Sequence, residues 1–181
     1  MIKSRYSIPE FLNDLNLKGE MVEVGVAFGG YAKFFIDGWK GKKIWLVDPY
    51  EEQSLEVYRE RDKKPYDSWH NQVKAMEDSD SRVKLIRKYS VDASMDFSND
   101  QLDFVYIDGN HEYSHVINDL DSWYPKLKSG GVFAGHDYNN NTDPPHYCEV
   151  ERALTDWRRA NDVLNFSVFD KSPKSFLFFK P

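Results

Sequence analysis

The sequence contains one cysteine, Cys148, so the chain cannot form an internal disulfide. We expect this thiol to be buried or idle and not a nucleophile. Long apolar runs are also missing: residues 1–9 have no apolar core of the signal-peptide type, and no later stretch is long enough to cross a bilayer. These absences favour a protein of the reducing cytoplasm without a membrane partner.

Runs of basic residues are absent as well. The formal net charge is -6, with 24 Lys and Arg against 30 Asp and Glu, and no basic segment could follow a phosphate backbone. We therefore expect no nucleic-acid partner. Repeats and low-complexity segments are missing too, and 181 residues is close to the common size of one domain. The sequence predicts a single domain over residues 1–181.

Strand-like and helix-like segments alternate along the chain. The apolar pattern predicts strands at 21–24, 43–47, 83–86, 101–107 and 132–135, and helices at 7–15, 31–39, 51–61, 68–76, 113–123 and 149–160. A terminal hairpin is expected from strands at 164–169 and 175–179. This alternation predicts an α/β fold of the Rossmann-like, doubly wound type with a mainly parallel sheet.

Three local features are expected within this pattern. Ser7 is a plausible N-cap for the first helix, because its side chain suits the unsatisfied amides of a helix start. Phe34 and Phe35 are both available for burial. Residues 129–131, SGG, read as a turn before the strand at 132–135.

A loop rich in small residues follows the first strand. Its sequence, EVGVAFGG at 23–30, has Gly25, Ala27 and Gly29 where backbone amides could approach a ligand closely. Gly25, Ala27 and Gly30 also fit a relaxed dinucleotide fingerprint, so the loop alone leaves several nucleotide ligands and a plain structural turn open.

Acidic residues near this loop separate the options by charge. Glu23 would repel the pyrophosphate of a dinucleotide but suits the ammonium and sulfonium groups of S-adenosylmethionine. Asp48, about 20 residues beyond the loop, stands where a carboxylate usually binds a ribose diol. Ser90 and Asp92 follow the third strand and could face the adenine, although a solvated turn fits them equally well.

Polar residues end the next two strands. Asp108 and His111 follow the strand at 101–107, and His136 and Asp137 follow the strand at 132–135. Carboxyl ends of neighbouring parallel strands meet at one sheet edge, so Asp108, His136 and Asp137 are candidate ligands for Mg²⁺ or another divalent cation. His111 is the candidate general base, since an imidazole can accept a hydroxyl proton near neutral pH. Bracing of loops by hydrogen bonds remains the alternative reading.

Two further histidines and one short motif are set aside. Residues 143–146, DPPH, resemble the acidic Pro-Pro-aromatic motif of amino-methylating nucleic-acid enzymes, but that motif belongs at the end of the fourth strand. We expect residues 139–147 to form a loop on the substrate side, and His70 and His146 to be surface or lid residues.

Taken together, these segments resemble the class I S-adenosylmethionine-dependent methyltransferases, in particular the sugar O-methyltransferases of antibiotic pathways. The resemblance rests on VEVG at 22–25 with Gly29, VD at 47–48, YIDGNH at 106–111 and GGVFAGHDY at 130–138. It runs in consistent order from Glu20 to Tyr138.

The resemblance implies a seven-stranded sheet with an antiparallel C-terminal strand. By position, Glu23, Gly25 and Gly29 would hold the methionine part of the donor and Asp48 its ribose. Positions matching Asp108, His136 and Asp137 bind magnesium in the sugar-modifying relatives, and the position matching His111 acts as the base, although those relatives usually carry an acid at the place of His136. The chain lacks the long segments that build a lid in larger relatives, so its acceptor site is either open or completed by another subunit of a homo-oligomer.

The leading hypothesis is methyl transfer from S-adenosylmethionine to a hydroxyl of a small molecule, with a sugar or glycoside favoured and a divalent cation assisting. An NAD-dependent oxidoreductase shares the fold and the ribose-binding Asp48, but Glu23 and the lack of a Tyr-x-x-x-Lys pair in the right region argue against it. A non-catalytic donor-binding domain is the third alternative.

Overall fold

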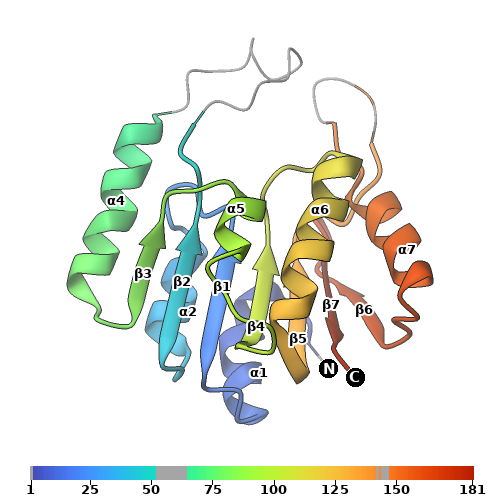
Figure 1. Ribbon diagram of the computed structural model, residues 1–181, viewed down its shortest axis with the longest axis horizontal. Helices are drawn as coiled ribbons and strands as arrows, with labels where there is room; N and C mark the ends of the chain where they lie inside the picture. The colour runs from blue at the N-terminus through green and yellow to red at the C-terminus, as the bar shows by residue number, and fades with distance from the viewer. Residues whose placement is uncertain (1, 52–64, 142, 144–146) are drawn as a thin grey trace.

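A seven-stranded sheet forms the middle layer of the protein (Figure 1). The computed structural model describes residues 2–51, 65–141, 143 and 147–181. The strands are β1 (Glu20–Val24), β2 (Lys43–Val47), β3 (Val83–Ile86), β4 (Leu102–Ile107), β5 (Leu127–Gly135), β6 (Phe166–Phe169) and β7 (Ser175–Phe179). Their order is β3-β2-β1-β4-β5-β7-β6, with β1 to β5 parallel and β7 antiparallel to both of its neighbours. The predicted Rossmann-like sheet, including its antiparallel last strand, is confirmed.

Helices cover both faces of this sheet. They are η1 (Arg5–Ser7), α1 (Ile8–Asp14), α2 (Ala32–Gly38), α4 (Tyr66–Ser79), α5 (Ser90–Ser94), α6 (Tyr113–Trp123), η2 (Tyr124–Lys126) and α7 (Val150–Ala160). In Figure 1, α5, α6 and α7 lie in front of the sheet, while α1 and α2 lie behind it. The helix predicted at 51–61 falls, except for Glu51, outside the described residues. No helix in the described part of the chain is both long and apolar enough to cross a membrane.

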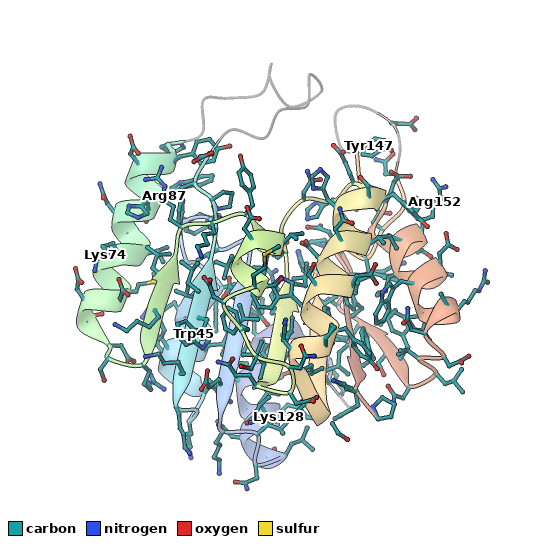
Figure 2. The ribbon with its side chains drawn as sticks, viewed as in Figure 1. Trp45, Lys74, Arg87, Lys128, Tyr147 and Arg152 are labelled. Carbon is teal, nitrogen blue, oxygen red and sulfur yellow. The ribbon has the colours of Figure 1, made fainter. Side chains whose placement is uncertain are left out.

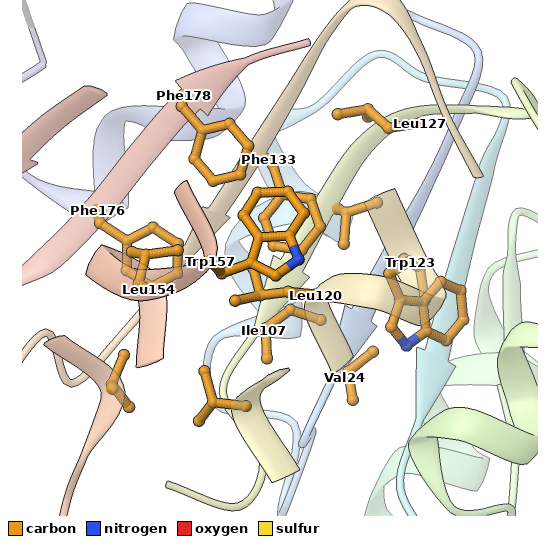
Figure 3. Close-up of a cluster of buried hydrophobic side chains, with 14 of the residues drawn as sticks. Val24, Ile107, Leu120, Trp123, Leu127, Phe133, Leu154, Trp157, Phe176 and Phe178 are labelled. Atoms are coloured by element: carbon orange, nitrogen blue, oxygen red, sulfur yellow. The ribbon is translucent and has the colours of Figure 1, made fainter. Parts of the chain in front are cut away.

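Each face of the sheet has its own apolar layer. Figure 3 shows the layer beneath α6 and α7, where Trp123 and Trp157 pack with Phe133 and Phe178. The rings of Phe133 and Phe178 are stacked with centroids 5.1 Å apart. Leu12, Phe35 and Val73 bring α1, α2 and α4 into the opposite layer. Fully burying one such side chain stabilises the fold by about 1.5–3 kcal/mol, so these layers hold the helices to the sheet.

Four local predictions need correction. Phe35 is fully buried but Phe34 is 45% exposed, because adjacent positions on a helix point about 100° apart. The SGG segment at 129–131 lies inside β5 and not in a turn before it; the pairing of β4 with β5 shifts register there, and Gly130 has a φ of +76°. Ser7 precedes α1, but its hydroxyl donates to Ser4 O and does not cap the helix. The short helix α5 was not predicted.

The strand register brings the ends of four strands to one level. Val24 of β1 pairs with Val47 of β2 and Ile107 of β4, and Ile107 pairs with Gly135 of β5. The residues that follow these strands therefore share the carboxyl edge of the sheet, which is the upper edge in Figure 1. Open α/β sheets bind their ligands at this edge.

A carboxyl group is buried on α6 near this edge. Asp119 is 5% exposed and is hydrogen bonded to the side chain of Ser90, whose Oγ also accepts a hydrogen bond from Trp123 Nε1 at 2.8 Å. Burial raises the pKa of Asp119 to about 7. The hydrogen bond between Asp119 and Ser90 joins α6 to α5, and burial favours the neutral form of the Asp119 carboxyl.

This burial makes the stability of the protein depend on pH. Because the folded-state pKa of Asp119 is raised, its carboxyl stabilises the fold most below pH 4, and that contribution is lost as the pH rises toward 7. We expect Asp119→Asn to remove this loss, so that the variant gains on the order of 2–3 kcal/mol relative to the parent between pH 5 and pH 8. Urea unfolding at the two pH values measures it. Exposed Asp162→Asn is the control, and an equal pH dependence in parent and Asp119→Asn would contradict the expectation.

Candidate active site

Glu23 lies within β1 and is turned into the protein. Its side chain is 2% exposed, and its Oε2 has no hydrogen-bond partner among the described residues. Burial and the negative charge of Asp108 raise the pKa of Glu23 well above its ordinary value. A buried carboxylate without a partner is costly, so this position requires either a proton or a bound cation.

Asp48 follows β2 and holds two neighbouring loops. Its Oδ2 accepts a hydrogen bond from Ala27 N at 2.9 Å, and its Oδ1 accepts one from Tyr50 N at 2.8 Å. Ala27 and Tyr50 both have left-handed backbones, with φ of 49° and 51°. Such conformations cost non-glycine residues about 1–2 kcal/mol each, and hydrogen bonds to a charged carboxylate offset that cost. Asp48, the residue predicted to bind the ribose, therefore also fixes the shape of the glycine loop.

The two glycines assigned to the donor are also required by packing. A Cβ at Gly25, where φ is +87°, would lie 2.1 Å from the carbonyl oxygen of Asp108. A Cβ at Gly29, where φ is +82°, would lie 2.7 Å from Met76 Cε on α4. Gly25 thus lets the loops after β1 and β4 touch, and Gly29 lets α4 approach. Their contact with the methionine part of a donor stays a prediction.

Tyr50 supplies a polar group that the sequence did not indicate. Its side chain is 2% exposed, and its hydroxyl has no hydrogen-bond partner among the described residues. Burial, followed by the negative charges of Asp48 and Glu23, raises the pKa of this hydroxyl. The ring also meets His70 edge-on, with centroids 5.2 Å apart, so His70 is a half-buried packing residue and not an isolated surface group.

The predicted adenine contacts lie after β3. The hydroxyl of Ser90 is engaged by Trp123 and Asp119 on α6, and Asp92 is exposed. Ser90 therefore has a structural role of its own, and its contact with a base stays a prediction.

Four titratable side chains meet after β4 and β5. His111 Nε2 lies 3.6 Å from Asp108 Oδ1 and 3.4 Å from Asp137 Oδ2. His136 Nδ1 lies 3.1 Å from Asp137 Oδ2 and 3.7 Å from Asp108 Oδ2. Although burial raises it, the pKa of Asp137 is lowered overall by its hydrogen bond with His136 and by nearby positive charge. The structure thus brings together all four residues expected at this edge.

One subset of these residues has metal-ligand spacing. One ligand atom each from Asp108, His111 and Asp137 lie within 4.8 Å of one another. The sequence had assigned His136 to the cation and His111 to proton transfer, so the geometry adds His111 to the candidate ligands. Two carboxylates and an imidazole suit a divalent cation.

Arg5 reaches this region from the N-terminal segment. Its Nη1 lies 3.4 Å from the hydroxyl of Tyr106 and 3.6 Å from Asp108 Oδ2. Its guanidinium lies over the ring of Tyr31, 4.9 Å from the centroid. Sequence reasoning missed Arg5, because nothing local in the chain links it to a strand end about 100 residues later.

The loop after β5 is joined to the loop after β4. Glu149 N donates to His111 O at 2.8 Å, and the Glu149 carboxylate accepts hydrogen bonds from Tyr147 and Arg152. Tyr147 and Arg152 lie near the upper ends of α6 and α7 (Figure 2). Of the DPPH motif, Asp143 is exposed and residues 144–146 lie outside the described part of the chain, as does the prediction for His146. Cys148 is free and buried, as expected.

The donor side fits a cationic ligand and not a diphosphate. Glu23 Oε2 and the Tyr50 hydroxyl are buried polar atoms that need partners, and the acidic Asp48 and Asp108 lie near them. These groups would repel phosphates but match the ammonium and sulfonium groups of S-adenosylmethionine. Fold and site together define the class I S-adenosylmethionine-dependent methyltransferases.

Comparison with known families agrees. Residues 22–138 match the family described as "Methyltransferase domain", and the chain belongs to that family. Membership of this family decides against the oxidoreductase considered from the sequence.

Individual proteins that resemble this chain share 30% of its sequence or less. An uncharacterized protein of Acanthamoeba polyphaga mimivirus is 30% identical over 127 residues, covering 66% of this chain and 51% of that protein. The chain thus spans about half the length of that curated relative. The O-methyltransferase NovP has a similar structure, with a TM-score of 0.71 and 18% identity over 97% of this chain and 77% of NovP. The structure of a Klebsiella pneumoniae protein proposed to be an O-methyltransferase is also similar, with a TM-score of 0.68 and 10% identity. The match covers 100% of this chain and 82% of that protein. These structural likenesses show the fold.

Removing one acceptor from Asp48 tests its bracing role. In Asp48→Asn only one side-chain oxygen remains, so the amides of Ala27 and Tyr50 cannot both keep their bonds. We expect the free energy of unfolding to fall by about 1–3 kcal/mol in urea titrations. Exposed Asp14→Asn should change it by less than about 0.5 kcal/mol. Equal stability of the two variants would refute the role.

The orphaned hydroxyl of Tyr50 is tested by its removal. We expect Tyr50→Phe to weaken binding of S-adenosylhomocysteine by about 3- to 10-fold, the usual effect of one neutral hydrogen bond, in calorimetric titrations. Ser175→Ala is the matched control, because Ser175 Oγ is also buried without a hydrogen-bond partner among the described residues, but lies in β7. A loss of affinity in both variants, or in neither, contradicts a donor contact at Tyr50.

Proposed function

We propose that the protein transfers the methyl group of S-adenosylmethionine to a hydroxyl of a small molecule, with a sugar or glycoside as the favoured acceptor. The observation that carries this proposal is the cluster of His111, Asp108 and Asp137 at the sheet edge near Glu23, whose Oε2 has no hydrogen-bond partner among the described residues. The cluster places a proton acceptor beside carboxylates. Methyl transfer to a hydroxyl needs an acceptor for the hydroxyl proton, and simple donor binding does not.

His111 is the proposed general base. Its Nε2 faces the carboxylates of Asp108 and Asp137 at 3.6 and 3.4 Å, and these negative charges stabilise the imidazolium that forms when a hydroxyl proton is taken up. Glu149 N binds the carbonyl of His111 and fixes its backbone. The base is therefore oriented from both its side chain and its main chain.

The donor supplies a methyl group on a positively charged sulfur, which an oxygen nucleophile attacks in line. Glu23 and Asp48 would fix the two polar ends of the donor, and the loop braced by Asp48 would set its depth at the edge. Holding both reactants in this geometry supplies a large part of the rate enhancement. These roles follow the positions assigned from the sequence.

Assistance by a divalent cation is a second, separable proposal. Asp108 and Asp137, with His136 or His111 as a third ligand, would hold Mg²⁺ or a similar ion, which would stabilise the developing alkoxide. An imidazole nitrogen that binds a cation cannot also accept a proton. We assign the proton to His111 and the cation to the carboxylates and His136, as the sequence indicated.

The acceptor is proposed to enter from the side of the loops after β4 and β5. Tyr113, Tyr147 and Arg152 lie on this side, where Arg152 stacks on Tyr113 with 4.6 Å to the ring centroid. Aromatic rings and hydrogen-bonding groups of this kind suit a small polyhydroxyl compound. A homo-oligomer and a cytoplasmic location stay predictions from the sequence.

Substitution of the base tests the reaction. We expect His111→Asn to lower the rate at which a glycoside acceptor is methylated by roughly 10²- to 10⁴-fold, because the hydroxyl proton loses its acceptor. Binding of S-adenosylhomocysteine should be unchanged. His115→Asn, an exposed histidine on α6, should keep full turnover. Full activity of His111→Asn would refute the assignment.

Metal binding is measured on the same variants. EDTA should abolish turnover and Mg²⁺ should restore it if a cation assists. His111→Asn should bind Mn²⁺ as the parent does, whereas Asp108→Asn and Asp137→Asn should not. Loss of Mn²⁺ binding in His111→Asn would make His111 a ligand and remove it as the base.

A further inference from the structure

Arg5 is held firmly at the site by its own main chain. The hydroxyl of Tyr31 donates to Arg5 O at 2.9 Å, and Arg5 N donates to Asp170 Oδ2 at 3.1 Å. These bonds tie the segment before α1 to α2 on one side and to the end of β6 on the other. These bonds fix the main chain of Arg5, so that only its side chain can change conformation.

The contacts of the guanidinium with Asp108 and Tyr106 are long. Its nearest carboxylate among the described residues is Asp108, at 3.6 Å, and its contact with Tyr106 is 3.4 Å. Close charge-assisted hydrogen bonds are 2.7–2.9 Å long, and a guanidinium carries five donors arranged to bind a carboxylate with two parallel bonds. The rings of Tyr31 and Tyr6 lie against the guanidinium, with centroids 4.9 and 5.3 Å away, and Tyr6 also makes a side-chain hydrogen bond with it. A guanidinium has five N–H donors, so the contacts with Asp108, Tyr106 and Tyr6 leave donors for a planar anion.

Arg5 and Glu23 carry groups of opposite charge that interact electrostatically. Tyr106 pairs with Glu23 across β1 and β4, and the hydroxyl of Tyr106 contacts Arg5. The positive charge of Arg5 lowers the pKa of Glu23, although burial and Asp108 raise it more. Glu23 Oε2 nevertheless has no hydrogen-bond partner in the part of the chain that the structure describes. An α-amino acid carries an ammonium and a carboxylate on one carbon, so it needs two opposite charges placed side by side.

We propose that Arg5 binds the carboxylate of the methionine moiety of the donor while Glu23 binds its ammonium. This assignment rests on the proposed function, because it takes S-adenosylmethionine as the ligand. It makes the segment before α1 part of the donor site. It also gives the only assigned cationic partner for the donor carboxylate among the described residues, since the other side chains assigned to the donor are acidic or neutral.

Two ligands that differ by the carboxylate alone test the proposal. Calorimetry compares S-adenosylhomocysteine with its decarboxylated analogue, which keeps the ammonium. The parent protein should prefer the complete ligand, and Arg5→Gln should lower that preference by roughly 10- to 100-fold without weakening the decarboxylated ligand. Arg5→Lys, which keeps the charge but loses the fork, should fall between the two.

Two further variants separate binding from structure. Arg158→Gln is the matched control, because Arg158 also stacks on an aromatic ring, Phe166, with 3.8 Å to the centroid, but lies away from the sheet edge. It should leave the preference unchanged. Glu23→Gln should weaken both ligands equally, since both carry the ammonium. Thermal unfolding confirms that each variant is folded before it is titrated.

The outcomes distinguish this proposal from the one on which it rests. A parent protein that binds both ligands equally, or a folded Arg5→Gln variant that keeps the preference or weakens both ligands alike, would overturn the role of Arg5 and leave methyl transfer standing. A parent protein that binds neither ligand would overturn the proposed function, and the role of Arg5 with it.

Discussion

The site depends on one unfavourable interaction, a carboxyl group in the sheet interior that lacks a partner. Glu23 is almost completely buried, lies near the negative Asp108 and Asp48, and leaves Oε2 without a hydrogen bond among the described residues. Desolvation of an unpaired charge is among the largest penalties in a folded protein. A cation removes this penalty, which explains why a positively charged methyl donor suits a fold that elsewhere binds phosphates.

Strained backbone conformations occur in the loops near Glu23. Ala27, Tyr50 and Asp137 have left-handed backbones, all at the carboxyl edge of the sheet. Asp48 accepts hydrogen bonds from the amides of the first two, so one carboxylate fixes both loops. Strained backbone held by neighbouring structure is typical of binding sites.

The sequence predicted the parts of this arrangement that depend on local pattern. Apolar strands that end in acidic residues gave Asp48, Asp108 and Asp137 their places, because parallel strands share one carboxyl edge. Long-range contacts were not predictable. Arg5 meets Asp108 through folding of a segment that has no motif of its own, and Ser90 is held by Trp123 on a helix that follows much later.

Other differences have equally physical causes. The glycines at 130 and 131 looked like a turn, yet backbone hydrogen bonds with Lys180, directly after β7, keep them within β5 as an irregular stretch of strand. Tertiary contacts override local propensity in such cases. Gly25 and Gly29 were assigned to ligand approach. The close carbonyl of Asp108 already requires glycine at 25, and the left-handed backbone, with φ of +82°, favours it at 29.

The hydrogen bond from Glu149 N to His111 O has a consequence for how the enzyme could diversify. It joins the loops after β4 and β5, and the bridge between Asn141 and Cys148 closes the second loop on itself. The residues proposed for the donor lie elsewhere: Glu23 in β1, Asp48 after β2 and Arg5 before α1. Segments grafted between 139 and 149 could therefore change which alcohol is accepted while the adenosyl pocket is inherited intact, a modular arrangement suited to laboratory evolution of new acceptor ranges.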